Sequence, residues 1–317
     1  MRPYQVFLLI LGIFIFSHPT FAAHGRYEEA MRVRGLLEIP QESIAPEDVA
    51  ERYVLPVSRG FSQEGTELCW VYATLNALES IFLARNESQK NELSRRTMQY
   101  FTFEDRYLRY IKGIENYLSE RGVAVDAIRL IQAGGLVAFR DYKDIVDPYG
   151  DADITRDVDH ASTSDQKIQI LYTDLDIVYS RPPNATHFDD TPISREGLAK
   201  QFLGNQVWES YAAASSGEEG YRRHPDPDAR QEAVSWYMPR SKFAQRIKAA
   251  LKANYAVEVT IGGHCIMLYG AEYDSNGTPL HYYMKDSYPD YFYTANPAKL
   301  HETLIEISTV KILSNME

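Results

Sequence analysis

Apolar positions along the chain predict three helical segments. Between residues 71 and 82 the apolar side chains are spaced four, three and four residues apart, as on one helical face: Val71, Leu75, Leu78 and Phe82. A second set recurs every fourth residue within 241–254: Phe243, Ile247 and Leu251. Residues 91–120 carry Tyr, Arg and Leu at helical spacing. We therefore expect helices in all three segments.

A β-hairpin is predicted near the C-terminal end of the sequence. Two β-branched, apolar segments flank Gly262-Gly263, and the second begins with His264. A further segment with strand character covers residues 281–285, and Asn276-Gly277 between them is a strong hairpin signal. An antiparallel pair joined by that turn would bring His264, near the start of one strand, beside Asp286, just after the next.

Two segments show no such periodicity. Residues 180–228 are rich in Pro, Asp, Ser and Gly, and we expect them to form an irregular insertion. Residues 141–160 are strongly acidic but lack the ligand spacing and closing glutamate of an EF-hand loop. We expect a solvated loop there, with no metal site.

Cys69 and His264 are the candidate nucleophile and base. Cys69 should lie in the first turn of a helix, where the helix dipole favours a thiolate. Gln63, six residues upstream, carries a side-chain amide that could donate to an oxyanion. Asp286 could orient the imidazole of His264, as a base of this kind requires. His281 is an alternative base, but it is expected to face a polar turn without such a partner.

Either Cys69 or His264 alone could be an ordinary buried residue, but together these motifs resemble those of the papain-like cysteine peptidases. The likeness rests on Gln63, Cys69-Trp70, Gly263-His264 and residues 285–287. The sequence around these motifs is most similar to that of the bleomycin hydrolase and aminopeptidase C branch. The resemblance implies an α+β fold of two lobes with a cleft between them. A helical left lobe, about 55–145, would carry Cys69, and an antiparallel, β-rich right lobe, about 166–317, would carry His264.

The resemblance also implies an activity. Such a chain would be a thiol hydrolase that cleaves peptide or isopeptide bonds of a peptide or protein substrate through an acyl-enzyme, without cofactor or metal. In it Cys69 would be the nucleophile, His264 the general base and then acid, Asp286 the orienting residue, and Gln63 an oxyanion donor. The residues that the resemblance places along the substrate are Trp70, Gly122, Gly263 and Tyr288.

Some positions depart from the family pattern. Asp286 stands where the family has Asn, and Tyr288-Pro289 stands where it has Trp-Gly. The connection from Val257 to His264 is short, so one wall of the cleft is expected to be missing. These departures leave two alternatives open: acyl transfer or deamidation on glutamine, as in transglutaminase-like proteins, and a catalytically silent papain-fold binding module.

The N-terminus predicts export. Arg2, an apolar run over 6–16 and small residues before Ala23 are typical of a secretory signal peptide covering residues 1–22. The run is too short for a permanent membrane anchor, so we expect a secreted or periplasmic protein. Residues 23–54 would form an N-terminal extension, and residues 55–317 the peptidase domain.

The charge and the cysteine content limit the possible partners and disulfide bonds of the chain. The net charge of −11 argues against a nucleic-acid partner. Two cysteines are too few for a disulfide framework in an exported chain. Because neighbours on a strand point to opposite faces, Cys265 should face the core if His264 faces the cleft.

Overall fold

The structure is a computed structural model, and the residues that it describes are 19–39, 46–63, 66–86, 91–115, 118, 122–144, 150–214, 220–222, 234–288 and 291–312. The apolar run predicted to be the centre of a signal peptide, residues 6–16, lies outside these ranges, as does Pro289. In the described part of the chain no helix is long and apolar enough to cross a membrane.

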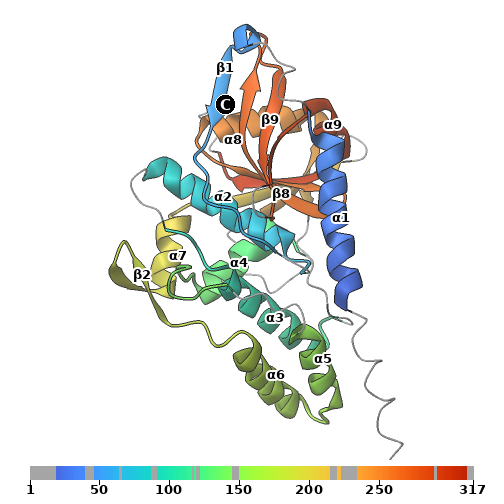
Figure 1. Ribbon diagram of the computed structural model, residues 1–317, viewed down its shortest axis with the longest axis vertical. Helices are drawn as coiled ribbons and strands as arrows, with labels where there is room; N and C mark the ends of the chain where they lie inside the picture. The colour runs from blue at the N-terminus through green and yellow to red at the C-terminus, as the bar shows by residue number, and fades with distance from the viewer. Residues whose placement is uncertain are drawn as a thin grey trace, which may run out of the picture.

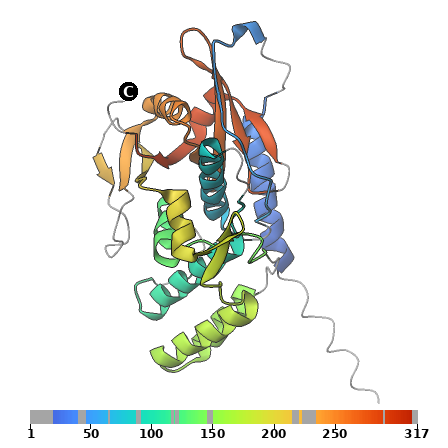
Figure 2. The ribbon, with the colours of Figure 1, turned by 90° about the vertical axis from the view of Figure 1, so that its left-hand side faces the viewer.

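The chain forms a helical half and a β-sheet half, and α2 (Cys69–Arg85) lies where they meet (Figure 1). The helical half contains α3 (Arg95–Ile111), α4 (Ala124–Gly134), α5 (Gly150–His160), α6 (Ser164–Val178), α7 (Arg195–Leu203) and a hairpin of β2 (Ala185–Phe188) and β3 (Thr191–Ser194). Helices α5 and α6 lie at the end of the molecule farthest from the large sheet (Figures 1 and 2).

Three boundaries differ from the sequence-based expectation. Helix α6 packs on α3 and α5, and α7 packs on α2 and α4, so residues 166–203 lie with the helices and not with the β-rich lobe. Residues 185–214 are regular rather than irregular, because they form β2, β3, α7 and the first long strand of the sheet. Residues 150–160 of the acidic stretch form helix α5 instead of a loop.

The β-sheet half is one large sheet with the order β10-β9-β8-β7-β11-β4-β6-β5, and β1 pairs with β8. Its strands are β1 (Glu51–Val54), β4 (Trp208–Ala214), β5 (Gly220–Arg222), β6 (Val234–Pro239), β7 (Val257–Ile261), β8 (His264–Tyr273), β9 (Pro279–Lys285), β10 (Phe292–Ala295) and β11 (Leu304–Val310). All described pairs are antiparallel except β4 with β6.

Three helices accompany the sheet: α1 (Pro19–Leu37), α8 (Phe243–Lys252) and α9 (Pro297–Thr303), together with short 3-10 turns at Pro46–Asp48 and Arg240–Lys242. Helix α8 buries the predicted apolar face. Helix α1 contacts α9, β10 and β8. The N-terminal extension therefore belongs to the sheet half (Figure 1).

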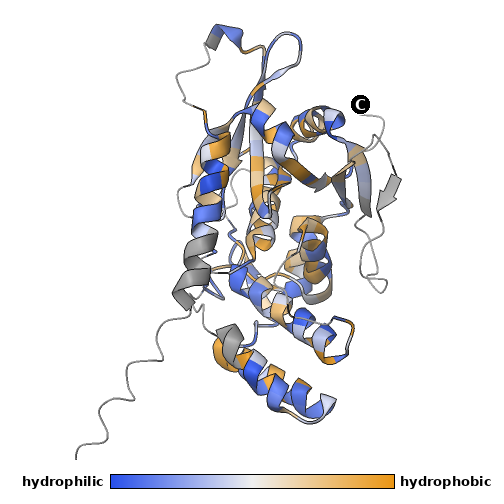
Figure 3. Ribbon diagram, turned by 90° about the vertical axis from the view of Figure 1, so that its right-hand side faces the viewer, coloured by the Kyte–Doolittle hydropathy of each residue, from blue (hydrophilic) through white to orange (hydrophobic). Residues whose placement is uncertain are grey.

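Helix α2 is buried from Cys69 to Phe82 on every side, and not on one face alone. One side packs against β7 and β8, and the other against α3, α4 and α7. Such all-round burial suits a central position, and the buried polar side chains of the helix, Asn76 and Glu79 among them, have hydrogen-bond partners. By contrast, α6 buries only Leu171 and Leu175 among its described residues, and the end of the molecule that α5 and α6 form is coloured mainly hydrophilic (Figure 3). Helix α2 thus joins the two halves and carries Cys69 into the space between them.

The predicted hairpin is present. Strands β8 and β9 are antiparallel, and Gly277 at their turn has φ +78°, which glycine adopts without strain. The Asp274 carboxylate accepts hydrogen bonds from the Asn276 and Thr278 amides at 2.9 and 2.8 Å. The turn therefore brings the residue after β9 back to the first residue of β8.

Candidate active site

Cys69 is the first residue of α2, as predicted, and its side chain is only 7% exposed. Hydrogen bonds from Cys265 and His264 to the sulfur lower the pKa of Cys69 well below that of a free thiol, although burial opposes ionisation. The positive end of the α2 dipole acts in the same direction. The surroundings of Cys69 therefore favour the thiolate more than they would for a free thiol.

His264 is the first residue of β8, and its imidazole Nε2 lies 2.7 Å from Asp286 Oδ1. Burial opposes the imidazolium charge, but Asp286 and the Cys69 sulfur more than compensate and raise the pKa of His264 to about 10. Because Nε2 donates to Asp286, Nδ1 is the nitrogen left for Cys69. The site thus favours a thiolate–imidazolium pair.

Asp286 is 1% exposed and follows directly after β9. Its Oδ1 accepts from His264 and from the Ser287 amide at 2.6 Å, whereas Oδ2 has no hydrogen-bond partner within the described part of the chain. Its own amide donates to the carbonyl of Tyr291 at 2.9 Å. The carboxylate is therefore held rigidly, with one oxygen committed to the imidazole.

Tyrosine rings cover this part of the site. Tyr288 is buried, and Tyr27 of α1 packs edge-on against it with ring centroids 5.7 Å apart. The hydroxyl groups of Tyr27 and Tyr291 are 2.6 Å apart. The ring next to the orienting residue is thus supported by a helix from the N-terminal extension, which the sequence analysis did not anticipate.

Gln63 is tied to the segment that carries Asp286. Its side-chain carbonyl accepts from the Ser287 hydroxyl, and its backbone amide donates to the Ser287 carbonyl at 2.9 Å. One side-chain N–H donates to the Thr66 carbonyl at 2.9 Å. A carboxamide has two N–H groups, so the second can serve an oxyanion beside Cys69.

These side chains meet in a pocket of about 480 Å³. Its lining includes Gln63, Cys69, Trp70, Gly122, Gly263 and His264 of the predicted set. A Cβ at Gly122 would lie 2.7 Å from the Trp70 indole, so only glycine fits there without displacing the ring. Tyr288 is not among the lining residues and lies against the tyrosine cluster instead.

Two residues that line the pocket were not predicted from the sequence. Glu29 and Arg32 of α1 form an ion pair with a 2.6 Å separation at the pocket mouth. Arg32 Nη2 lies 3.3 Å from the place of a Cβ on Gly262. Helix α1 therefore supplies a wall at the short β7–β8 connection, where one was expected to be missing. Buried Ala30, Val33 and Leu37, at helical spacing, were the signal that could have found it.

The expectation that Cys265 faces away from the site is wrong. Cys265 lines the same pocket as His264, and its thiol is a hydrogen-bond partner of Cys69. His264 and Cys265 pair in register with Ile261 and Thr260 directly after the Gly262-Gly263 turn, and both nevertheless line the pocket, which lies at this end of the strand. His281 Nε2 lies 3.1 Å from a Glu272 carboxylate oxygen, but neither of its ring nitrogens makes a hydrogen bond within the described part of the chain, and burial lowers its pKa.

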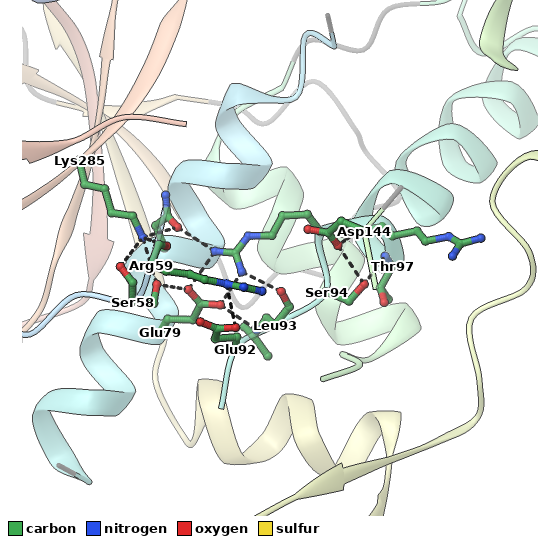
Figure 4. A network of polar contacts seen from close by, with 12 residues as sticks. Ser58, Arg59, Glu79, Glu92, Leu93, Ser94, Thr97, Asp144 and Lys285 are labelled. Atoms are coloured by element: carbon green, nitrogen blue, oxygen red, sulfur yellow. Dashed lines mark hydrogen bonds and ion pairs between the residues drawn. The ribbon is translucent and has the colours of Figure 1, made fainter. Parts of the chain in front are cut away.

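A buried polar network connects the site to the helical half (Figure 4). Lys285, just before Asp286, donates to Ser58 Oγ and to Asn76 Oδ1 of α2, both at 3.0 Å. Burial lowers the pKa of Lys285 to about 7, against the attraction of Glu79. Glu79 in turn forms a two-point ion pair with Arg95 of α3, at 2.5 and 2.9 Å. This network fixes the end of β9 relative to the helix that carries Cys69.

A second buried acid, Glu258 on β7, lies beneath the nucleophile. Its Oε2 is 2.7 Å from the Thr74 hydroxyl, which also donates to the Trp70 carbonyl at 2.8 Å. Since that hydroxyl has one hydrogen, the contact with Glu258 is satisfied when the carboxyl carries the proton. Burial, with smaller contributions from Glu306 and Cys69, raises the pKa of Glu258 to about 8. Glu258 is therefore a neutral acid at neutral pH.

Among the described residues, no group of three or more His, Cys, Asp or Glu side chains could hold a metal ion. The pocket brings together a thiol whose pKa is lowered, an imidazole whose pKa is raised and an amide donor, which are the groups that nucleophilic chemistry requires.

The two halves, with the pocket between them, define a papain-like two-lobed fold, and a solved structure supports this class. PepW from Lactobacillus rhamnosis HN001 matches with a TM-score of 0.63 at 13% identity, over 93% of this chain and 90% of that one. Digestive procathepsin L 3 of Tenebrio molitor reaches 0.40 at 13% identity, over 87% and 74%. No family model and no curated protein matches the chain. At these identities the likeness establishes the fold alone.

Proposed function

We propose that this protein is a papain-like thiol hydrolase that cleaves peptide or isopeptide bonds through an acyl-enzyme on Cys69. The observation that carries the proposal is the alignment of three groups from separate elements: a thiol at the start of α2, an imidazole at the start of β8, and a carboxylate 2.7 Å from that imidazole. The lowered pKa of Cys69 and the raised pKa of His264 add support, because such a pair stores the proton that the leaving group needs.

The reaction follows from these positions. The Cys69 thiolate attacks the carbonyl carbon, and the Gln63 amide and the Cys69 backbone N–H stabilise the oxyanion. The C–N bond breaks as the His264 imidazolium donates its proton to the leaving amine, which leaves an acyl-thioester. The neutral imidazole then removes a proton from water, hydroxide attacks the thioester, and the acid departs as the thiolate and imidazolium re-form.

We also propose that the substrate is a peptide or protein chain that lies against Trp70, Gly122 and Gly263. Tyr288 acts differently, as a cover over Asp286 rather than as a substrate contact. The N-terminal sequence supports export with removal of residues 1–22. Cleavage there would keep Glu29 and Arg32 in the mature protein, and N-terminal sequencing of secreted material tests it by finding Ala23 first.

Selective alkylation tests the nucleophile. Iodoacetamide at about pH 5 to 6 should label Cys69, since its thiolate persists where a free thiol is protonated. Peptide mass mapping reads out both cysteines, so Cys265 is an internal control. Equal labelling of the two, or none, would contradict the proposal and favour a catalytically silent binding module.

Deamidation or acyl transfer on glutamine is a second candidate, favoured by the carboxylate of Asp286. The two activities consume the same acyl-enzyme but release different products. New amino termini from a protein substrate indicate hydrolysis of peptide bonds, and ammonia from a glutamine peptide indicates the alternative. The Cys69→Ser variant, which keeps the shape of the site, is the control for both assays.

A further inference from the structure

Cys265 has no part in the hydrolysis proposed above, yet it lies against the nucleophile. The chain has two cysteines, Cys69 and Cys265, which are 196 positions apart in the sequence. The fold brings them to one pocket from the start of α2 and from the second residue of β8. Both are buried, with exposures of 7% and 3%, and the Cys265 thiol is a hydrogen-bond partner of the Cys69 sulfur.

Cys265 has polar neighbours, unlike a cysteine that serves only to fill space in an apolar core. Its sulfur lies 3.4 Å from the Thr260 hydroxyl, and the protonated Glu258 is another neighbour. A small apolar residue would suffice to close the base of the pocket, and it would leave no second sulfur beside the thiolate. In an exported chain, where the surroundings are oxidising, two adjacent thiols are poised for disulfide chemistry.

We propose that Cys69 and Cys265 form a reversible disulfide, and that this bond shuts the site when a small-molecule disulfide is present as oxidant. Cys69 would be the attacking cysteine and Cys265 the resolving cysteine. The bond needs the two sulfurs to approach to about 2 Å. It removes the nucleophile without unfolding either lobe.

The chemistry is two exchange steps. The Cys69 thiolate attacks one sulfur of the small disulfide, the S–S bond of that molecule breaks, and one thiolate leaves and takes a proton from the His264 imidazolium. The Cys265 sulfur then attacks Cys69 in the mixed disulfide and expels the second small thiolate, which takes the Cys265 proton. Two protein thiols are oxidised to one disulfide, and one small disulfide is reduced to two thiols.

The order of the steps follows from the site. While Cys69 is a thiolate, its hydrogen bond and charge, together with burial, raise the pKa of Cys265, so Cys265 remains a protonated donor. Once Cys69 is capped in the mixed disulfide, that negative charge is gone and Cys265 ionises more readily. The first step therefore prepares the second, and the resting enzyme is not spontaneously oxidised by way of Cys265.

Thiol counting and intact mass test the proposal without relying on activity. Folded protein is incubated with oxidised glutathione, quenched with acid, and analysed. Wild type should lose both titratable thiols and two hydrogen atoms in mass, with no adduct remaining, and dithiothreitol should restore both thiols. Cys265→Ser keeps a hydroxyl donor beside Cys69 and should stop at one stable glutathione adduct. Cys69→Ser should remain unmodified, because it lacks the attacking thiolate.

The contrary results are equally clear. A persistent glutathione adduct on wild type, or the same adduct level in wild type and Cys265→Ser, would overturn the disulfide. Activity, with each variant normalised to its own untreated rate, adds a second readout: dithiothreitol removal of the bond should restore the wild-type rate. If no hydrolysis is found for any variant, the function proposed above fails, while the thiol count still decides whether the disulfide forms.

Discussion

Replacing Asp286 with Asn removes the charge that holds the imidazolium but keeps the shape of the side chain. The pKa of His264, ordinarily near 6.5, is raised to about 10. That difference corresponds to roughly 4–5 kcal/mol at about 1.4 kcal/mol per pH unit, shared between Asp286 and the Cys69 thiolate. In Asp286→Asn the carboxylate share is lost, so the imidazolium should deprotonate at lower pH. The alkaline limb of the pH–rate profile should move acidward by at least about one unit.

The geometry around Asp286 also determines how much of the rate Asp286→Asn loses at its optimal pH. Asn can present its carbonyl to His264 Nε2 and to the Ser287 amide, as Oδ1 does now at 2.7 and 2.6 Å. Its NH2 would then replace Oδ2, which has no hydrogen-bond partner within the described residues. Burying that donor costs about 1–3 kcal/mol of stability. The rate at the optimum should remain within about tenfold of wild type, or about 1.4 kcal/mol.

The assay is a full pH–rate profile of wild type, Asp286→Asn and Asp286→Ala on one peptide substrate, with folding checked by circular dichroism at each pH. Asp286→Ala cannot accept from Nε2 at all and should lose more activity than Asn. A collapse of Asp286→Asn at every pH would refute the equivalence of amide and carboxylate, and would favour chemistry that depends on the carboxylate and its imidazole tautomer. An unchanged profile would mean that Asp286 does not act on His264.

Three further changes test the supporting structure. Arg95→Ala should lower the free energy of unfolding by about 3–5 kcal/mol in urea titrations, because it leaves the buried Glu79 charge unpaired; an effect below about 1 kcal/mol would contradict the network. Gly122→Ala should reduce kcat/KM and cost about 1–3 kcal/mol of stability by pushing the Trp70 ring, whereas Gly35→Ala, with open space at its Cβ, should do neither. Glu258→Gln should match wild type near pH 4 and exceed it by a few kcal/mol near pH 8. The raised pKa of Glu258 favours folding fully below about 4.5, and that advantage is lost as the pH rises to about 8. Equal stability at both pH values would rule out a buried neutral Glu258.

The site could be predicted largely because its signals are local. Asn276-Gly277 determines a tight turn, so the meeting of His264 and Asp286 followed from sequence alone. Cys69 at a helix start also followed from the apolar spacing of α2. Export and the catalytic roles of Cys69, His264 and Asp286 remain predictions.

What could not be predicted depends on contacts between distant segments. The position of α1 beside Gly262 follows from packing on β8, β10 and α9, for which the sequence of α1 offers only a short apolar stripe. The assignment of residues 166–203 to the sheet half was wrong. The packing of α6 and α7 on other helices depends on tertiary contacts, which the local sequence pattern does not show. The orientation of Cys265 was predicted wrongly because strand alternation alone does not determine which side chains reach a pocket at the end of a strand.

The order of the site residues along the chain has a consequence for synthesis. Gln63 and Cys69 precede His264 by about 200 residues, whereas His264 and Asp286 are joined through one hairpin. At about 5–20 residues per second, the ribosome makes the thiol some 10–40 s before the imidazole. Until then no base raises the reactivity of Cys69. The thiolate–imidazolium pair that we propose can therefore form only after the hairpin has been made and has closed against α2.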